Sequence, residues 1–290
     1  MDDNCEYRHP VDLSGDSSAY FIVPSSIIFN KDIGEKRLTA FSYFSVRRGI
    51  DRTLSFSTNE IVRWSGRTPN RRANGINEKI YDAVGKLEDY GYLKISGDYS
   101  GAHIADAYFD LSMVLEESEH ERFAIIYADE LKSVLKYDGF NSGDKLMNND
   151  VVLLVFSYLR MMIYRRPNKL RPEELNSDGK NSHKHDVDSR RIRSPEAYNG
   201  YYCDIADDIG LSPRIVSKAI DALEELGLIY TEPLPRIKLG DKWITSHTLF
   251  CNVYKREGQK LLNSGSEYYL REIHNKKLKL NVVSKSKEIV

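Results

Sequence analysis

The chain contains the same sequence pattern twice, and this repeat restricts the fold more than any other feature. Residues 41–44 (Phe-Ser-Tyr-Phe) recur as 156–159 (Phe-Ser-Tyr-Leu), a shift of 115 positions (156 − 41). Residues 83–93 recur as 219–229, a shift of 136 positions (227 − 91, between matching glycines). Since self-similarity of this kind indicates a duplicated structural unit, we expect two related halves. Two unrelated helical hairpins that share a short triplet are the alternative.

The two shifts differ by 21 positions (136 − 115), which predicts an insertion in the second copy. The candidate is 167–198, a polar stretch rich in arginine and lysine. Such a stretch either follows phosphates along a nucleic acid or stays solvated. The expected organisation is an N-terminal domain at 18–115, a C-terminal domain at 120–255 that carries this insertion, and a C-terminal helix with a basic tail at 256–290.

Three helices are predicted in the second copy, at 151–164, 202–209 and 213–226. Asn149 or Asp150 is expected to cap the first of them. Ser212 is a typical N-cap for the third, and Pro213 a typical first residue, because its missing amide would be unpaired there anyway. Two strands, at 228–239 and 243–254, should then form a hairpin.

The first copy fits the same plan with one departure. Helices are predicted at 36–48 and 59–64, the second capped by Ser57 or Thr58 and ended by Gly66. A third helix is expected over 69–90, about eight residues longer than its counterpart (144 − 136). A turn at Asn74 and Gly75, followed by a helix from Ile76, is the alternative. Strands are expected at 92–96 and 102–111.

This order of elements resembles the winged helix-turn-helix superfamily, in which a glycine ends the recognition helix and two strands form the wing. The resemblance implies an α+β fold of two tandem winged helix-turn-helix units, mostly helical, with small antiparallel β-wings. A helix of this kind enters the major groove of DNA, where arginine pairs with guanine and asparagine with adenine. Residues 69–74 (Pro-Asn-Arg-Arg-Ala-Asn) supply both side-chain types.

We therefore predict DNA contacts at the start of each third helix, beside it and at the second wing, with a solvated helix face as the alternative. The predicted residues are Arg63, Arg67, Thr68, Asn70, Arg71, Arg72, Asn74, Lys79, Ser212, Arg214, Ser217, Lys218, Lys238 and Lys242. The formal net charge of −1 counts against nucleic-acid binding, but clustered charge decides more than the sum does.

No catalytic pattern is present, and we expect a protein without enzymatic activity, metal or cofactor. The chain has no nucleophile elbow, zinc-protease motif or phosphate-binding loop. His183, His185, Asp186 and Asp188 lie in the polar insertion, where no scaffold would fix a metal geometry. The three cysteines are far apart and the longest apolar stretch, 151–164, is too short for a bilayer, so we expect a cytoplasmic protein without membrane contact.

Two winged-helix units in a chain of 290 residues resemble the iteron-type replication initiators of plasmids. The first unit also resembles the N-terminal part of Gram-positive plasmid initiators and of phage primosome proteins. The resemblance covers about residues 20–255 and lies in the architecture. It implies origin recognition on double-stranded DNA, with a homodimer and host replication proteins as partners. A winged-helix transcriptional regulator is the first alternative, and a primosome or partition protein that acts through protein contacts is the second.

Overall fold

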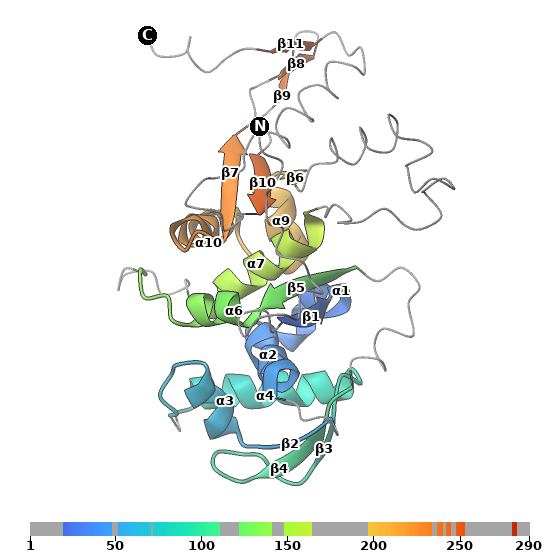
Figure 1. Cartoon of the computed structure of the whole chain (residues 1–290), viewed down its shortest axis with the longest axis vertical. Helices are drawn as coiled ribbons and strands as arrows, with labels where there is room; N and C mark the ends of the chain where they lie inside the picture. The colour runs from blue at the N-terminus through green and yellow to red at the C-terminus, as the bar shows by residue number, and fades with distance from the viewer. Residues whose placement is uncertain are drawn as a thin grey trace, which may run out of the picture. The chain divides into compact units, whose positions relative to one another are not determined.

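The computed structural model describes residues 20–47, 52–70, 72–110, 122–140, 148–163, 197–233, 237–239, 242–244, 248–252 and 280–282. These residues form an α+β fold in which eight α-helices alternate with small antiparallel sheets of two or three strands (Figure 1). The chain divides into two compact units. The helical unit comprises Asp12–Met161 and Ile205–Leu226, and the strand unit comprises Met1–Val11, Met162–Asp204 and Gly227–Val290.

The first half of the chain forms one run of helices and strands. In chain order these are β1 (Tyr20–Pro24), α1 (Ser25–Phe29), the 3-10 helix η1 (Lys31–Ile33), α2 (Arg37–Arg47), β2 (Thr53–Phe56), α3 (Thr58–Trp64), α4 (Ile76–Asp89), β3 (Lys94–Ser96) and β4 (Ala105–Tyr108). Strand β4 lies between β2 and β3 in an antiparallel sheet, with Tyr108 opposite both Thr53 and Lys94.

The second half follows with a similar run. Its elements are β5 (Phe123–Tyr127), α6 (Ala128–Leu135), α7 (Asn149–Met162), β6 (Ala197–Gly200), α9 (Tyr202–Ile209), α10 (Pro213–Glu225), β7 (Ile229–Pro233), β8 (Ile237–Leu239), β9 (Lys242–Ile244), β10 (Thr248–Asn252) and β11 (Leu280–Val282). Strand β10 lies between β6 and β7, while β8 lies between β11 and β9.

The two halves share one topology. Each has a strand, a short helix, a longer helix, a second strand and two more helices, followed by two strands in the first half and five in the second. The sheet order β2-β4-β3 in the first half corresponds to β6-β10-β7 in the second, with β8 and β9 inserted between β7 and β10. The strands that open the halves, β1 and β5, pair with each other, with Tyr20 opposite Tyr127. The element order therefore repeats as the sequence repeat predicts, although the opening strand and short helix of each half (β1 and α1, β5 and α6) and the strands β2 and β6 were not predicted.

Several predicted helix ends are confirmed. The Ser57 side chain accepts a hydrogen bond from the amide of Glu60 at the start of α3, and the Ser212 side chain accepts one from Ile215 at the start of α10. Helix α9 has the predicted bounds, and Gly210 after it takes a φ of 76°, which favours glycine. The cap of α7 was predicted one residue too late, because the Asn148 side chain accepts from the amides of Asp150 and Val151.

The prediction of one long third helix over 69–90 is wrong. Helix α4 begins at Ile76 and has 14 residues, close to the 13 of α10. Asn74 takes a φ of 58° in the left-handed region, which a right-handed helix cannot contain, and Gly75 is the extended N-cap residue. The eight extra residues therefore lengthen the connection before α4. The connection between α3 and α4 has eleven residues, 65–75, whereas the connection between α9 and α10 has three, 210–212.

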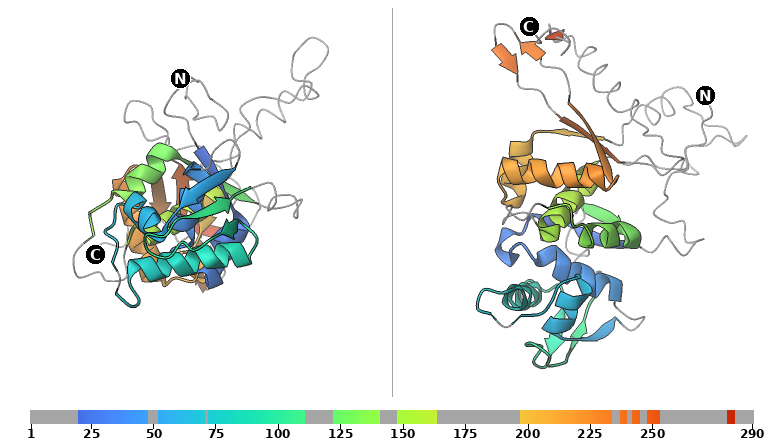
Figure 2. Two further views of the ribbon diagram at one scale, coloured as in Figure 1. Left: turned by 90° about the horizontal axis from the view of Figure 1, so that it is seen from below. Right: turned by 90° about the vertical axis from the view of Figure 1, so that its left-hand side faces the viewer.

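An aromatic cluster fills the core of the helical unit. Phe44 lies 4.9 Å from Phe56 and Phe41 lies 5.4 Å from Phe109, measured between ring centroids, and all four are fully or almost fully buried. Helix α2 carries two of these rings and contacts both α4 and β1, and it lies between α4 and the β1–β5 pair in Figure 1 and in the right-hand view of Figure 2. Burial of the α2 face that carries these rings fixes the position of α3, α4 and the loop that joins them.

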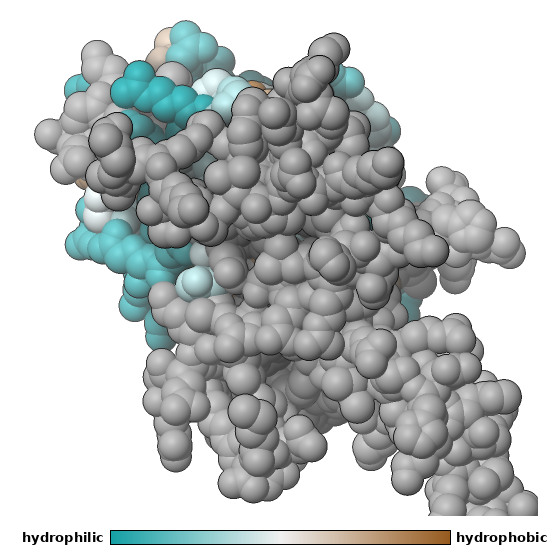
Figure 3. Space-filling model, turned by 90° about the horizontal axis from the view of Figure 1, so that it is seen from above, coloured by the Kyte–Doolittle hydropathy of each residue, from teal (hydrophilic) through white to brown (hydrophobic). Residues whose placement is uncertain are grey.

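The described residues on the face drawn in Figure 3 are mostly hydrophilic.

Candidate nucleic-acid interface

The connection between α3 and α4, residues 65–75, forms a folded loop in front of α4, here named the α3–α4 loop. The amide of Gly75 donates to the carbonyl oxygen of Arg72 (2.9 Å) and closes a turn. The amide of Asn70 donates to Asn77 Oδ1 (2.8 Å), and the amide of Asn74 donates to Glu78 Oε2 (2.5 Å). Side chains from the first turn of α4 therefore hold the main chain of the loop at two points.

Gly75 lies where the loop folds back on itself. A Cβ atom at this position would overlap the side-chain oxygen of Asn70 and lie 2.6 Å from the carbonyl oxygen of Arg72. Real Cβ atoms do not approach a backbone oxygen this closely, so the turn requires glycine.

Asn77 also connects the loop to α3. Its Nδ2 donates to Asn59 Oδ1 (2.6 Å) while its Oδ1 accepts from the amide of Asn70. The side-chain amide thus uses a donor and its acceptor within the protein. Asn77 is half-buried, and no predicted site residue lies at this position.

The first part of the α3–α4 loop is fastened to α7 through Asp150, whose carboxylate is fully buried. This carboxylate accepts hydrogen bonds from Arg67 (2.5 and 3.1 Å), from Lys36 Nζ (2.6 Å) and from the hydroxyl of Thr39. Burial would raise the pKa of Asp150, but the charges and hydrogen bonds of Lys36 and Arg67 outweigh it and lower the pKa below its ordinary value. The carboxylate therefore stays ionised.

Arg67 was predicted to contact DNA, and its guanidinium is engaged with Asp150 instead of lying free on the surface. Its side chain is 23% exposed. The paired guanidinium contributes to the structure of the loop, and a phosphate contact by Arg67 stays a prediction.

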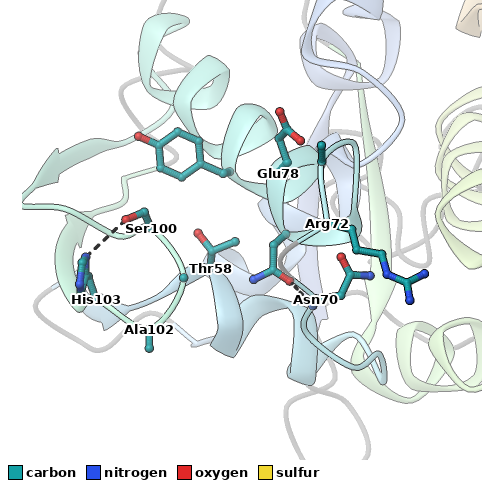
Figure 4. Close-up of a pocket in the computed structure, with 11 residues that line it drawn as sticks. Thr58, Asn70, Arg72, Glu78, Ser100, Ala102 and His103 are labelled. Carbon is teal, nitrogen blue, oxygen red and sulfur yellow. Dashed lines mark hydrogen bonds between the residues drawn. The ribbon is translucent and has the colours of Figure 1, made fainter.

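Most other predicted residues of the first half are exposed. Arg63 on α3 and Thr68, Asn70, Arg72 and Asn74 in the loop are all exposed. In the part of the chain that the structure describes, neither Arg63 nor Arg72 forms an ion pair. Arg72 extends away from Ser100 and His103 in the close-up of Figure 4. Lys79 lies 3.3 Å from Glu35, and Arg71 lies outside the described residues.

A groove of about 650 Å³ separates the α3–α4 loop from the β3–β4 connection (Figure 4). Its far wall is formed by Ser100–His103, and the stacked rings of Tyr81 and Tyr99 lie beside it, 4.5 Å apart. Hydrogen bonds from the Ser100 amide, and next from His103, lower the pKa of Asp98 to about 2. Asp98, next to this wall, is therefore ionised at neutral pH, and Arg72 lines the groove on the side of the loop.

The exposed face of α4 is acidic beyond its first turn. Asp82 and Asp89 are exposed there. Lys86, on the same helix, donates to the carbonyl oxygen of Asp32. A DNA backbone would therefore meet favourable charge at the loop and unfavourable charge further along α4.

Helix α10 in the second half has a similar distribution of charge, with a basic residue at its start and acidic residues toward its far end. Arg214 at the start of the helix is exposed and, in the described ranges, forms no ion pair. Ser212 caps the helix, while Ser217 and Lys218 are half-buried. Asp221 and Glu225 are exposed toward the far end, where Glu225 accepts a hydrogen bond from Tyr137 (2.5 Å).

The predicted residues of the second wing lie on two paired strands. Lys238 on β8 is opposite Trp243 and Asn281, and Lys242 on β9 is opposite Leu239. The greater part of the 167–198 insertion lies outside the described residues, and so do the four histidines and aspartates noted within it.

The residues that hold the loop were not predicted as part of the site. Asn59, Asn77, Glu78 and Asp150 are ordinary polar residues of helices, and their role depends on contacts 4 to 83 positions away along the chain. The one available signal was Glu78, three residues after the N-cap residue Gly75, because glutamate at that position is typical of a helix start.

The described residues contain no cluster of histidine, cysteine, aspartate and glutamate side chains that could hold a metal ion. Of the helices in the described ranges, none is long and apolar enough to cross a membrane. A comparison of the sequence with protein-family models finds no match, and a comparison with curated proteins finds no similar sequence.

Proposed function

We propose that the chain is a sequence-specific, double-stranded DNA-binding protein without enzymatic activity. The observation that supports this proposal best is the repeated element order, which places an exposed arginine shortly before α4 (Arg72) and at the start of α10 (Arg214). An arginine in this position can form bidentate hydrogen bonds with guanine or contact a phosphate. The β3–β4 and β7–β10 pairs would then be the wings of two winged helix-turn-helix units.

We further propose that this DNA binding serves replication initiation at a plasmid or mobile-element origin. Two DNA-binding units in one chain suit a site that presents two successive grooves on one side of the duplex. A homodimer and host replication proteins would be the further partners, and the cytoplasm the compartment. This proposal draws on the architectural resemblance to iteron-type initiators.

A footprint on selected genomic fragments, taken at two salt concentrations, tests both specific DNA binding and the role in replication initiation. Equally spaced direct repeats with steep salt dependence would support an initiator. One palindrome over a promoter would replace it with a transcriptional regulator. If wild-type protein protects no particular sequence at either salt concentration, specific DNA binding is wrong.

The acidic residues on the exposed face of α4 favour a second candidate function, in which the chain acts mainly through protein contacts. Exposed Asp82 and Asp89 would repel a DNA backbone but would suit a basic protein surface. A primosome or partition protein would therefore bind DNA weakly and without sequence preference. Its binding to a partner protein would weaken when these two carboxylates are replaced by amides.

A further inference from the structure

We propose that Asn77 and Glu78 are positioning residues of the DNA interface, which shape the α3–α4 loop so that its arginines meet DNA. This inference rests on the proposed function. By position, both residues lie in the first turn of α4, where asparagine and glutamate are suited to read adenine and cytosine. Their contacts assign them a different task.

The Asn77 side chain is held within the protein at both polar atoms. Its oxygen accepts from the Asn70 amide at 2.8 Å, and its nitrogen donates to Asn59 at 2.6 Å. A turn of the side chain toward a base would break both hydrogen bonds, and the Asn70 amide would lose its acceptor.

Glu78 is unfavourable as a direct contact for a different reason. Its carboxylate lies beside the positive loop, where a negative charge repels phosphates. It nevertheless accepts the hydrogen bond of the Asn74 amide at 2.5 Å. This bond holds the one described loop residue other than glycine whose φ, 58°, lies in the left-handed region.

The two bonds fix the main chain on both sides of Arg72. Asn70 is held before it, Asn74 after it, and the Gly75 amide is bonded to the carbonyl oxygen of Arg72 itself. A loop already folded in this way loses less conformational entropy when it binds. Removal of either side chain should therefore weaken binding through the arginines, without altering which base is preferred at any single position.

The closing experiment compares variants of the full chain on the footprinted duplex by fluorescence anisotropy. Asn77→Ala should weaken binding at least about fivefold, the usual contribution of one hydrogen bond, because it removes both the bond to the Asn70 amide and the bond to Asn59. It should cost nothing further in a chain that already carries Arg71→Ala and Arg72→Ala, because a positioning residue acts through those side chains. Single-base substitutions in the duplex should affect the Asn77→Ala variant and the wild type by equal factors.

Two substitutions of Glu78 separate the effect of its charge from the effect of its hydrogen bond. Glu78→Gln keeps an acceptor and removes the charge, so binding should stay equal or become tighter. Glu78→Ala loses the acceptor and should bind more weakly than Glu78→Gln by about fivefold. Asp82→Asn, one turn further along α4, controls for removal of a negative charge alone.

Amide hydrogen exchange without DNA provides an independent readout. The Asn70 amide should exchange faster in Asn77→Ala, and the Asn74 amide faster in Glu78→Ala. The inference is overturned by a preference relaxed at one base pair in Asn77→Ala, by full additivity with the arginine variants, or by equal binding of the two Glu78 variants. A wild-type protein that binds no specific DNA overturns the proposed function itself.

Discussion

At the scale of single residues, Asp150 is a buried carboxylate on which a network of charged and polar side chains depends. Its buried carboxylate is shared by Lys36, Thr39 and Arg67, which come from two separate parts of the first half. Removal of one partner from a buried ion pair leaves the other charges uncompensated, which costs more than the pair contributes. Asp150 therefore joins the first long helix of the second half to the base of the α3–α4 loop.

Replacement of Asp150 tests this role. Asp150→Ala should lower the free energy of unfolding by about 3–5 kcal/mol, because buried Lys36 would keep only Glu35 as its partner and partly exposed Arg67 would lose its ion pair. Urea unfolding at neutral pH followed by circular dichroism measures the change. A decrease below about 1 kcal/mol would show that water or another acceptor compensates the two cations.

The same carboxylate predicts a pH dependence. Its pKa is lower in the folded chain than the ordinary value of about 3.9, so its contribution to stability is present above the ordinary pKa and is lost as the pH falls through the folded value. Wild-type protein should therefore lose stability on acidification below about pH 4 more steeply than Asp150→Asn. Urea midpoints measured from pH 7 down to pH 3 compare the two, and parallel curves would contradict the assignment.

At the scale of elements, the α3–α4 loop is the part on which DNA contact depends most. Arg71→Ala combined with Arg72→Ala should weaken specific binding by about 1–3 kcal/mol for each base that these arginines read. The melting temperature should stay unchanged, because in the described structure Arg72 is exposed and forms no ion pair. Wild-type affinity in this double variant would remove the loop from the interface.

The turn at Gly75 predicts a stability effect of its own. Gly75→Ala should cost about 1–3 kcal/mol, because the new methyl group must displace the Asn70 side chain and the Arg72 carbonyl. Asn74→Gly is the matched control, since glycine takes a φ of 58° without strain. Thermal unfolding should separate the two variants, and equal melting temperatures would show that the loop moves freely.

Sequence reasoning predicted the helices better than the loop between them. Local signals, such as Ser57, Ser212 and the glycines after the helices, are enough to bound α3, α9 and α10. The pattern at 69–74 also allows a helix, and only the left-handed Asn74 and the fold-back at Gly75 exclude it. Those features depend on Asn77 and Glu78, and the ion pair of Arg67 depends on a residue 83 positions away. The turn at Asn74 and Gly75 was available as an alternative, whereas a contact as distant as that of Arg67 has no signature in one sequence.

At the scale of the whole molecule, the two halves should contribute separately to DNA binding. Arg72→Ala and Arg214→Ala each remove an exposed arginine from one half. We expect each variant to lose protection over a different part of the footprint, with additive decreases in binding free energy, because the two sites share no described contact. Disappearance of the complete footprint in either variant would show that one half carries all specific contacts.

The pairing of β1 with β5 also determines when the chain can fold. Tyr20 is opposite Tyr127, so this ribbon closes only after 107 further positions (127 − 20) have been synthesised. Contacts so far apart in sequence form slowly, and until then β1 lacks its partner strand. A fragment that starts at residue 120 would contain β5 without its partner strand. The first half therefore cannot complete this ribbon until the start of the second half has been made.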